Sequence, residues 1–291
     1  MHKVHKIIIR CRYIVLSLLA ISMLNACTSL FFFPMKKLVR TPTDLGLNYQ
    51  DVLIATDDGN TLHGWFLPAA EMAKATVLFL HGNAENISTH IGAVYWLPEQ
   101  NYNVLLYDYR GYGKSTGIPS LPEAVDDVKA VYDIIPTLTQ QPNRPIIVFG
   151  QSLGGAIAVN AVGAFSATRQ IDALVIESSF ANFRQIAREK LAENWFTWVL
   201  QWPLSLTITG NYNPTEALAS IQKLPILIIH GTDDQVVGYH HAQTLINAAS
   251  SPKQLWKIPH GQHIQAMTIP QYRMQFLKYL DELVRPKVHE G

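Results

Sequence analysis

Hydrophobic and polar positions alternate in two neighbouring segments of this chain, Gln50–Thr56 and Thr61–Leu67. Alternation with a period of two is typical of β-strands that bury one face. An Asp58–Gly59 step lies between the two segments, and Asp-Gly is a preferred pair in tight hairpin turns. The pattern therefore predicts an antiparallel hairpin at the start of a folded domain.

Six short apolar runs follow the hairpin, and helical stretches separate them. Near-continuous Val, Ile and Leu strands are typical of a sheet whose two faces are both covered by helices. This alternation of strand and helix predicts an α/β domain with a mostly parallel central sheet and right-handed crossovers. The runs are ATVLFLHG (75–82), NVLLYDYR (103–110), PIIVFG (145–150), DALVIESS (172–179), PILIIHG (225–231) and KQLWKIPHG (253–261).

Residues 180–222 interrupt the alternation with a longer, aromatic-rich and mostly helical insertion. We interpret residues 49–291 as one domain that carries this insertion as a small helical cap. Aromatic side chains of such a cap are expected mainly to pack in its core, and together they can wall an apolar acyl pocket. They are Phe183, Trp195, Phe196, Trp198 and Trp202.

The N-terminus has the pattern of an export signal. Residues 1–26 carry four Lys or Arg residues and no acidic residue, and Ile14–Leu24 is an apolar run of signal-peptide length. The tetrapeptide Leu24–Cys27 resembles the bacterial lipobox, which implies a cleaved signal (1–26), a lipidated Cys27 and a tether over 27–48. Thr28 does not supply the aspartate that marks inner-membrane retention, which favours an outer membrane if the organism has one.

An uncleaved membrane anchor is the alternative. No charged residue occurs from Tyr13 through Met35, so the apolar stretch is long enough to span a bilayer. Both interpretations place a folded domain on a membrane, on its periplasmic or other extracytoplasmic face.

Composition narrows the class of protein. The chain has 291 residues, 48% hydrophobic and 15% charged, with a formal charge of +1, which is unlike a disordered chain. No basic run beyond the N-terminus suggests a nucleic-acid partner. Cys11 and Cys27 are the only cysteines, so the domain has no disulfide framework or Cys-rich metal site. The sequence predicts neither a metal nor a cofactor.

One serine stands at the end of a predicted strand in the sequence VFGQSLGG (148–155). A chance G-x-S-x-G occurs in roughly one chain in ten of this length, so the pentapeptide alone is weak. Here a strand precedes it and a small-residue helix follows, which is the setting of a nucleophile elbow. The context indicates that Ser152 is a nucleophile.

A nucleophilic serine needs a histidine base, and the base needs a carboxylate that orients it. Both residue types occur later in the chain, in the order Ser, Asp, His, directly after predicted strands. The acid candidates are Asp233 and Asp234, and the base candidates are His260 and His263.

Five motifs, which follow one another along residues about 50–283, resemble those of a known family. They are HGNAEN, DYRGYGKSTG, GQSLG, HGTDDQVV and a late G-x-H. The chain resembles the α/β-hydrolase superfamily, and most of all its membrane-associated α/β-hydrolase-domain proteins. The resemblance implies the α/β-hydrolase fold, with helices on both faces of the sheet and a helical cap. The family patterns place the triad acid at Asp234 and the base at His263.

The same resemblance implies an oxyanion hole made by the backbone N–H groups of Leu153 and Asn83. Family members often have glycine where this chain has Glu85, which indicates a loop of different shape. Among the remaining histidines, His81 and His230 are expected to support loops. His240 and His241 begin a predicted helix and are expected to cap it or to lie at the surface.

These observations predict a serine hydrolase that cleaves a small acyl ester or thioester through an acyl-enzyme on Ser152. Two alternatives stay open. One is a serine peptidase or amidase of the same fold, since fold and triad do not separate the two chemistries. The other is a tethered binding module without turnover.

Overall fold

The computed structural model describes residues 31–139, 141, 144–193, 195–208, 210–250 and 252–285. The predicted signal segment 1–26 and Cys27 lie outside these residues, so the lipidation site stays a prediction. Within the described ranges, no helix combines the length and the apolar character that a membrane crossing requires.

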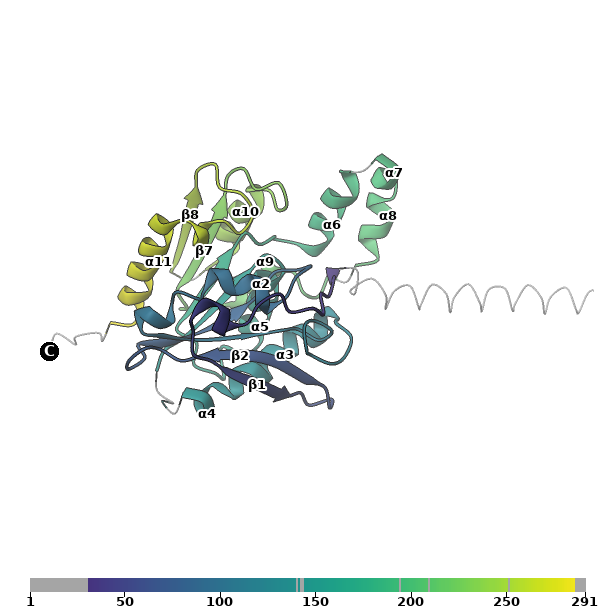
Figure 1. Ribbon diagram of the computed structural model, residues 1–291. Coiled ribbons are helices and arrows are strands. Elements are labelled where there is room, and N and C mark those ends of the chain that lie inside the picture. The colour runs from purple at the N-terminus through teal and green to yellow at the C-terminus, as the bar shows by residue number, and fades with distance from the viewer. Residues whose placement is uncertain are drawn as a thin grey trace, which may run out of the picture.

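In the described part of the chain, eight strands form one sheet at the centre of the molecule (Figure 1). They are β1 (Gln50–Ala55), β2 (Thr61–Leu67), β3 (Ala75–Leu80), β4 (Tyr102–Tyr107), β5 (Ile146–Gln151), β6 (Ala173–Glu177), β7 (Ile226–Gly231) and β8 (Lys253–Ile258). Their order across the sheet is β1-β2-β4-β3-β5-β6-β7-β8. β1 and β2 form the predicted antiparallel hairpin, β2 pairs antiparallel with β4, and all later neighbours are parallel. The predicted strands and the mostly parallel sheet are therefore confirmed.

Helices and short 3-10 turns connect the strands. The α-helices are α2 (Ile87–His90), α3 (Leu121–Asp133), α4 (Ile135–Thr139), α5 (Leu153–Phe165), α6 (Phe183–Ala192), α7 (Trp195–Trp198), α8 (Gln201–Leu206), α9 (Pro214–Ser220), α10 (His240–Ala248) and α11 (Pro270–Leu283). The 3-10 turns are η2 (Pro42–Leu45), η3 (Ile91–Ala93), η4 (Pro98–Gln100) and η5 (Ala266–Thr268).

Each face of the sheet has its own hydrophobic core. One core joins the sheet to α3, α5, α9 and α10, and the other joins it to α2 and α11. In β3, Leu78 and Leu80 belong to the first core, while Val77 and Phe79 belong to the second. Successive side chains of a strand point to opposite faces, so a strand covered on both sides must be apolar throughout.

The helices α6, α7 and α8 project from one end of the body, as Figure 1 shows. They occupy the predicted cap region between β6 and α9. The described part of the predicted tether, residues 31–48, packs against the body. Phe32 is buried in the first core, and Asn86 Nδ2 donates hydrogen bonds to the backbone oxygens of Met35 and Lys37. This segment therefore contributes to the folded domain.

Candidate active site

Ser152 lies in the sharp turn between β5 and α5. Its backbone angles are φ 52° and ψ −119°, an unusual conformation for a residue with a side chain. Strained backbone of this kind often marks functional sites. The Ser152 N–H donates to the carbonyl oxygen of Glu177 at 2.9 Å, which ties the turn to the neighbouring strand. The serine is thus held at the carboxyl edge of the sheet, where ligands of open α/β sheets bind.

The glycines around Ser152 are required by close backbone packing. A Cβ atom on Gly154 would overlap the carbonyl oxygens of Leu80 and His81, and one on Gly150 would overlap the carbonyl oxygen of Gly154. Strand, turn and helix therefore approach each other at a distance that only glycine permits. This close packing of the backbone explains the two glycines of the G-x-S-x-G sequence.

Asp234 and His263 lie beyond the ends of β7 and β8. His263 Nδ1 lies 2.8 Å from Asp234 Oδ2. The other carboxylate oxygen, Oδ1, accepts hydrogen bonds from the N–H groups of Val236 and Val237, both at 2.9 Å. Burial opposes ionisation of Asp234, but hydrogen bonds from His230 and His263 outweigh it and hold the pKa of the carboxyl well below its usual range. An ionised Asp234 accepts the Nδ1 proton, which leaves Nε2 of His263 free to act as a base.

The competing pair lies apart from this arrangement. His260 Nδ1 is 3.1 Å from Asp233 Oδ2, and the His260 side chain is 89% exposed. The four candidates thus form two separate pairs. The exposed pair faces solvent, whereas His263 lines the same cavity as Ser152 and pairs with the buried Asp234.

Four of the predicted site residues line one cavity, which has a volume of about 840 Å³. Ser152, Leu153, Asn83 and His263 all line it. Its other walls are mainly apolar and come from the N-terminal segment, the turn after β6 and the cap; they include Phe31, Phe33, Phe180, Ile186, Leu204 and Ile208. The volume is within the usual range for small-molecule sites.

Most aromatic side chains of the cap do not lie where the sequence predicted. Phe183 is buried as predicted, but Trp195, Phe196, Trp198 and Trp202 are 57–75% exposed. Aliphatic cap residues form the cavity wall instead. The expected packing of these four aromatics in a cap core was therefore wrong, because α7 and α8 project away from the sheet.

The two expected oxyanion donors, Leu153 and Asn83, belong to different elements that both line the cavity. Leu153 is the first residue of α5, and N–H groups in a first helical turn have no intrahelical acceptor. Asn83 uses its side chain to hold the loop. Its Oδ1 accepts from Tyr112 Oη at 2.6 Å, and its Nδ2 donates to the Phe31 carbonyl at 2.6 Å. The loop comes close to the nucleophile, because a Cβ on Gly82 would lie 3.4 Å from Ser152 Cβ.

Glu85 also lines the cavity, with its carboxylate 3.6 Å from His90 Nε2. The His90 side chain is almost fully buried, and its Nδ1 lies 3.4 Å from Gln151 Oε1. Burial lowers the pKa of His90, which the nearby Glu85 partly counteracts. His90 is a polar group of the cavity wall that sequence reasoning missed, since a lone histidine in a short helix carries no motif.

Polar residues at the end of β6 hold the loop that carries His263. Glu177 Oε1 accepts from the Ala266 N–H at 2.9 Å, and Ser178 Oγ accepts from the Ile264 N–H at 3.0 Å. Burial raises the pKa of the Glu177 carboxyl. Sequence reasoning also missed these positions, although polar residues directly after a buried strand were a visible signal.

The two histidines at strand ends make short local hydrogen bonds. His81 Nδ1 lies 2.6 Å from the Gly82 oxygen, and His230 Nε2 lies 2.7 Å from the Val237 oxygen. Burial lowers the pKa of His81 to about 3, so this ring is neutral at physiological pH. Both contacts suit the expected support of loops next to the site.

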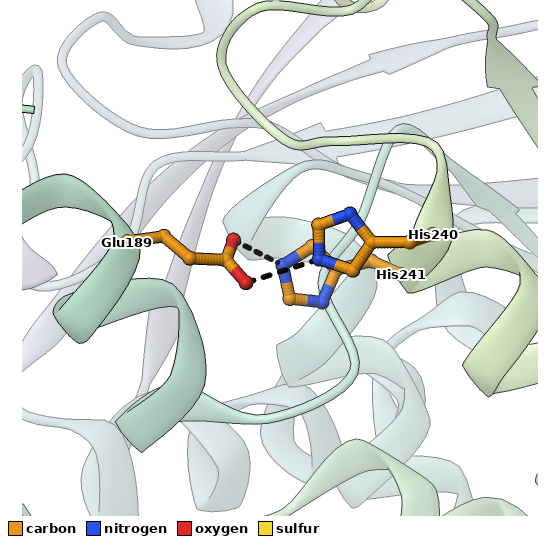
Figure 2. A group of neighbouring side chains, drawn as sticks. All are labelled: Glu189, His240 and His241. Atoms are coloured by element: carbon orange, nitrogen blue, oxygen red, sulfur yellow. Dashed lines mark hydrogen bonds and ion pairs between the residues drawn. The ribbon is translucent and has the colours of Figure 1, made fainter. Parts of the chain in front are cut away.

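His240 and His241 connect the body to the cap (Figure 2). Glu189 of α6 points at both rings, with Oε2 2.8 Å from His241 Nε2 and Oε1 3.0 Å from His240 Nε2. His240 is half exposed as expected, but His241 is fully buried, so a surface position was wrong for it. We call Glu189, His240 and His241 the cap latch.

The cap latch has the donor types of a metal site, and the three groups lie within 4.8 Å of one another. Its hydrogen bonds fit a different role. The Ala181 N–H donates to His241 Nδ1, so Nε2 carries the ring proton and donates it to Glu189. Metal ligation by Nε2 would require the opposite tautomer. The geometry favours a hydrogen-bonded link between α6 and α10.

Comparison with known proteins agrees with this fold. Residues 71–215 match the family model described as serine aminopeptidase, S33, a range that includes Ser152 but ends before Asp234 and His263. The chain is 33% identical to uncharacterized protein YfhR of Escherichia coli (strain K12) over 82% of each chain. It is 32% identical to the α/β-hydrolase domain-containing protein WAV2 of Arabidopsis thaliana, over 77% of this chain and 75% of that protein.

A solved structure, the Pyrococcus furiosus esterase Pf2001, has a similar fold. It superposes with a TM-score of 0.68 at 24% identity, over 87% of this chain and 97% of that one. The sheet order, the serine turn and these relatives lead to one conclusion. This chain belongs to the α/β-hydrolase family.

Proposed function

We propose that this protein is a membrane-tethered serine hydrolase that cleaves acyl esters or thioesters. Ser152 is the nucleophile, His263 the general base, and Asp234 the acid that orients the ring. The observation that best supports this proposal is the bond between His263 Nδ1 and Asp234, at the edge of a cavity that Ser152 also lines.

The reaction has two steps. His263 Nε2 takes the Ser152 proton while Oγ attacks the carbonyl carbon, and the Leu153 and Asn83 amides hold the resulting oxyanion. The imidazolium then gives its proton to the leaving alcohol or thiol, which departs and leaves an acyl-Ser152 ester. Water attacks this ester while His263 accepts its proton, and the imidazolium then returns a proton to Ser152 Oγ as the acyl–oxygen bond breaks, which releases the carboxylic acid and restores both residues.

The character of the cavity supports an acyl substrate. Phe31, Phe33 and Leu204 are among the apolar groups that form most of its wall. An acyl chain would exchange water for apolar contact along this wall, which is favourable in proportion to the area buried.

The tether is the N-terminal segment, attached through lipid on Cys27 or through an uncleaved anchor. Acyl chains contribute about 0.8 kcal/mol per buried CH₂, so several chains give stable attachment. Metabolic labelling with a palmitate analogue separates the two forms. Labelled wild type with an unlabelled Cys27→Ser variant supports lipidation, and equal labelling of both contradicts it.

A fluorophosphonate probe tests the nucleophile directly. Wild type is expected to react covalently, Ser152→Ala to remain unlabelled, and Ser220→Ala, which removes an exposed serine, to react like wild type. Turnover of a p-nitrophenyl ester should fall on the order of 10⁶-fold in Ser152→Ala. Folded wild-type protein that does not react would favour the binding-module alternative.

A peptidase is the second candidate, because the matching family model is described as serine aminopeptidase. A substrate panel of p-nitrophenyl esters, acyl thioesters and aminoacyl anilides distinguishes the two functions. Ester or thioester cleavage with no anilide cleavage is the expected result. The reverse preference would replace the proposal with peptidase activity.

A further inference from the structure

The tip of the cap gathers exposed apolar side chains. Fifteen large hydrophobic residues are exposed in the described part of the chain, and eight of them lie within residues 195–206. Single exposed apolar residues are ordinary, but a contiguous group indicates an interaction surface. We call these eight residues the cap patch: Trp195, Phe196, Trp198, Val199, Leu200, Trp202, Leu204 and Leu206.

Charge surrounds the cap patch but does not enter it. No Asp, Glu, Lys or Arg occurs between Glu193 and Glu216. The adjoining helix α6 supplies Arg188, whose guanidinium carbon lies 4.6 Å from the centre of the Trp202 ring. Glu189 of α6 binds the two histidines, and Glu193, directly after this helix, pairs with Lys190. The patch is therefore apolar at its centre, with a cation at its border.

The N-terminal segment enters the structure beside the cap. The Phe31 ring, the first in the described residues, packs edge to face on Phe183 of α6 with centroids 5.0 Å apart. The apolar run Ile14–Leu24 ends seven residues before Phe31, and Cys27 lies four residues before it. Seven extended residues span at most about 25 Å, so a bilayer that holds this run, or a lipid on Cys27, lies close to the cap.

The cap patch also adjoins the cavity. Leu204 of α8 is 41% exposed, and it lines the cavity as well. Leu191 and Ile208, which precede and follow the patch in the sequence, also line the cavity. The exposed apolar surface and the apolar cavity wall therefore meet at α8.

We propose that the cap patch docks on the lipid bilayer that holds the N-terminus, so that acyl substrates pass from the membrane directly into the cavity. Tryptophan is the side chain that most favours the membrane–water interface, and Arg188 at the border suits anionic headgroups. This inference rests on the membrane tether of the proposed function. It does not depend on catalysis.

Tryptophan fluorescence of the full chain in vesicles of phosphatidylcholine and phosphatidylglycerol tests the docking. One variant carries Trp195→Ser, Trp198→Ser and Trp202→Ser. The emission of wild type minus the emission of this variant gives the contribution of the cap tryptophans. The control carries Leu53→Ser, Met72→Ser and Met274→Ser, which are exposed on other parts of the molecule. Brominated lipid is expected to quench most of the cap emission in wild type and in the control.

Vesicle flotation separates tether from docking. If all three proteins float but brominated lipid does not quench the cap emission, the tether holds and the docking proposal is overturned. If the cap tryptophans are shielded from acrylamide without lipid, and the protein sediments as a dimer, a second copy covers the patch and the proposal is also overturned.

Activity gives a second readout. The cap variant is expected to hydrolyse a short, water-soluble ester like wild type and to lose rate only on a long-chain ester dissolved in vesicles. Loss on both substrates would instead indicate a damaged site. Failure of every protein to react with the fluorophosphonate probe would overturn the proposed catalysis while leaving the quenching result valid.

Discussion

Asp234 Oδ2 lies 2.8 Å from Nδ1 of His263, a residue 29 positions further along the chain. The carboxylate thereby selects the tautomer of a ring that lines the cavity, with the proton on Nδ1 and Nε2 unprotonated. Since three neighbouring donors, from Val236, Val237 and His230, keep Asp234 ionised and in place, this pair is formed before any substrate binds.

Asp234→Asn is expected to lower kcat by about 10⁴-fold, because an amide no longer selects the correct tautomer. The matched control is Asp233→Asn, whose carboxylate pairs with the exposed His260. Steady-state kinetics on a p-nitrophenyl ester measures both variants. Equal losses in the two would contradict the assignment of Asp234 as the triad acid.

Gly154→Ala is expected to destabilise the protein by about 3 kcal/mol or more, because its methyl group would overlap two backbone oxygens. Gly92→Ala is the control, since a Cβ there has no atom within 4 Å. Urea unfolding measures both. A Gly154→Ala protein as stable as wild type would show that the turn can open without cost.

Asp127→Ala is expected to cost about 1–3 kcal/mol of stability, because it removes the acceptor of two Arg110 hydrogen bonds and leaves Asp58 as the remaining carboxylate partner of the guanidinium. Arg110 Nε and Nη2 each donate to this carboxylate at 2.7 Å. Asp133→Ala is the control, because it removes a more exposed ion pair with Arg169. This variant is expected to lose about 0–1 kcal/mol of stability. Similar unfolding free energies for the two variants would argue against the buried pair as a stabilising contact.

Acid is expected to loosen the cap latch. Burial lowers the pKa of His241 from 6.5, and hydrogen bonds from Gln185 and His241 lower that of Glu189 from 4.5 against the opposing effect of its burial. Both groups therefore bind protons less tightly in the folded protein than in the unfolded chain. Stability contributed by the latch falls as pH drops below 6.5 and falls further below 4.5.

Hydrogen exchange of α6, corrected for intrinsic rates, measures this loosening. Protection of residues 183–192 should decrease from pH 7 to pH 5, and Glu189→Gln should decrease it already at pH 7. Glu193→Gln removes an exposed carboxylate at the end of the same helix and should exchange like wild type. Unchanged protection in Glu189→Gln would show that other contacts hold the cap.

Much of the architecture could be predicted from local patterns. The hairpin was visible in the alternation around Asp58–Gly59, and each buried parallel strand in a short apolar run, because a strand covered on both faces admits little else. The serine turn was equally visible, since close backbone packing permits only glycine at Gly150 and Gly154. The α/β class and the position of the candidate nucleophile were thus determined by the sequence itself.

Only the tertiary structure decided which distant groups meet. It paired His263 with Asp234 and His260 with Asp233, placed Phe31 and Phe33 in the cavity wall, and turned the cap tryptophans outward. It also buried His241 against Glu189 of the cap. Such contacts join segments tens of residues apart, so they depend on how the helices pack around the sheet, and no local period in the sequence encodes that packing.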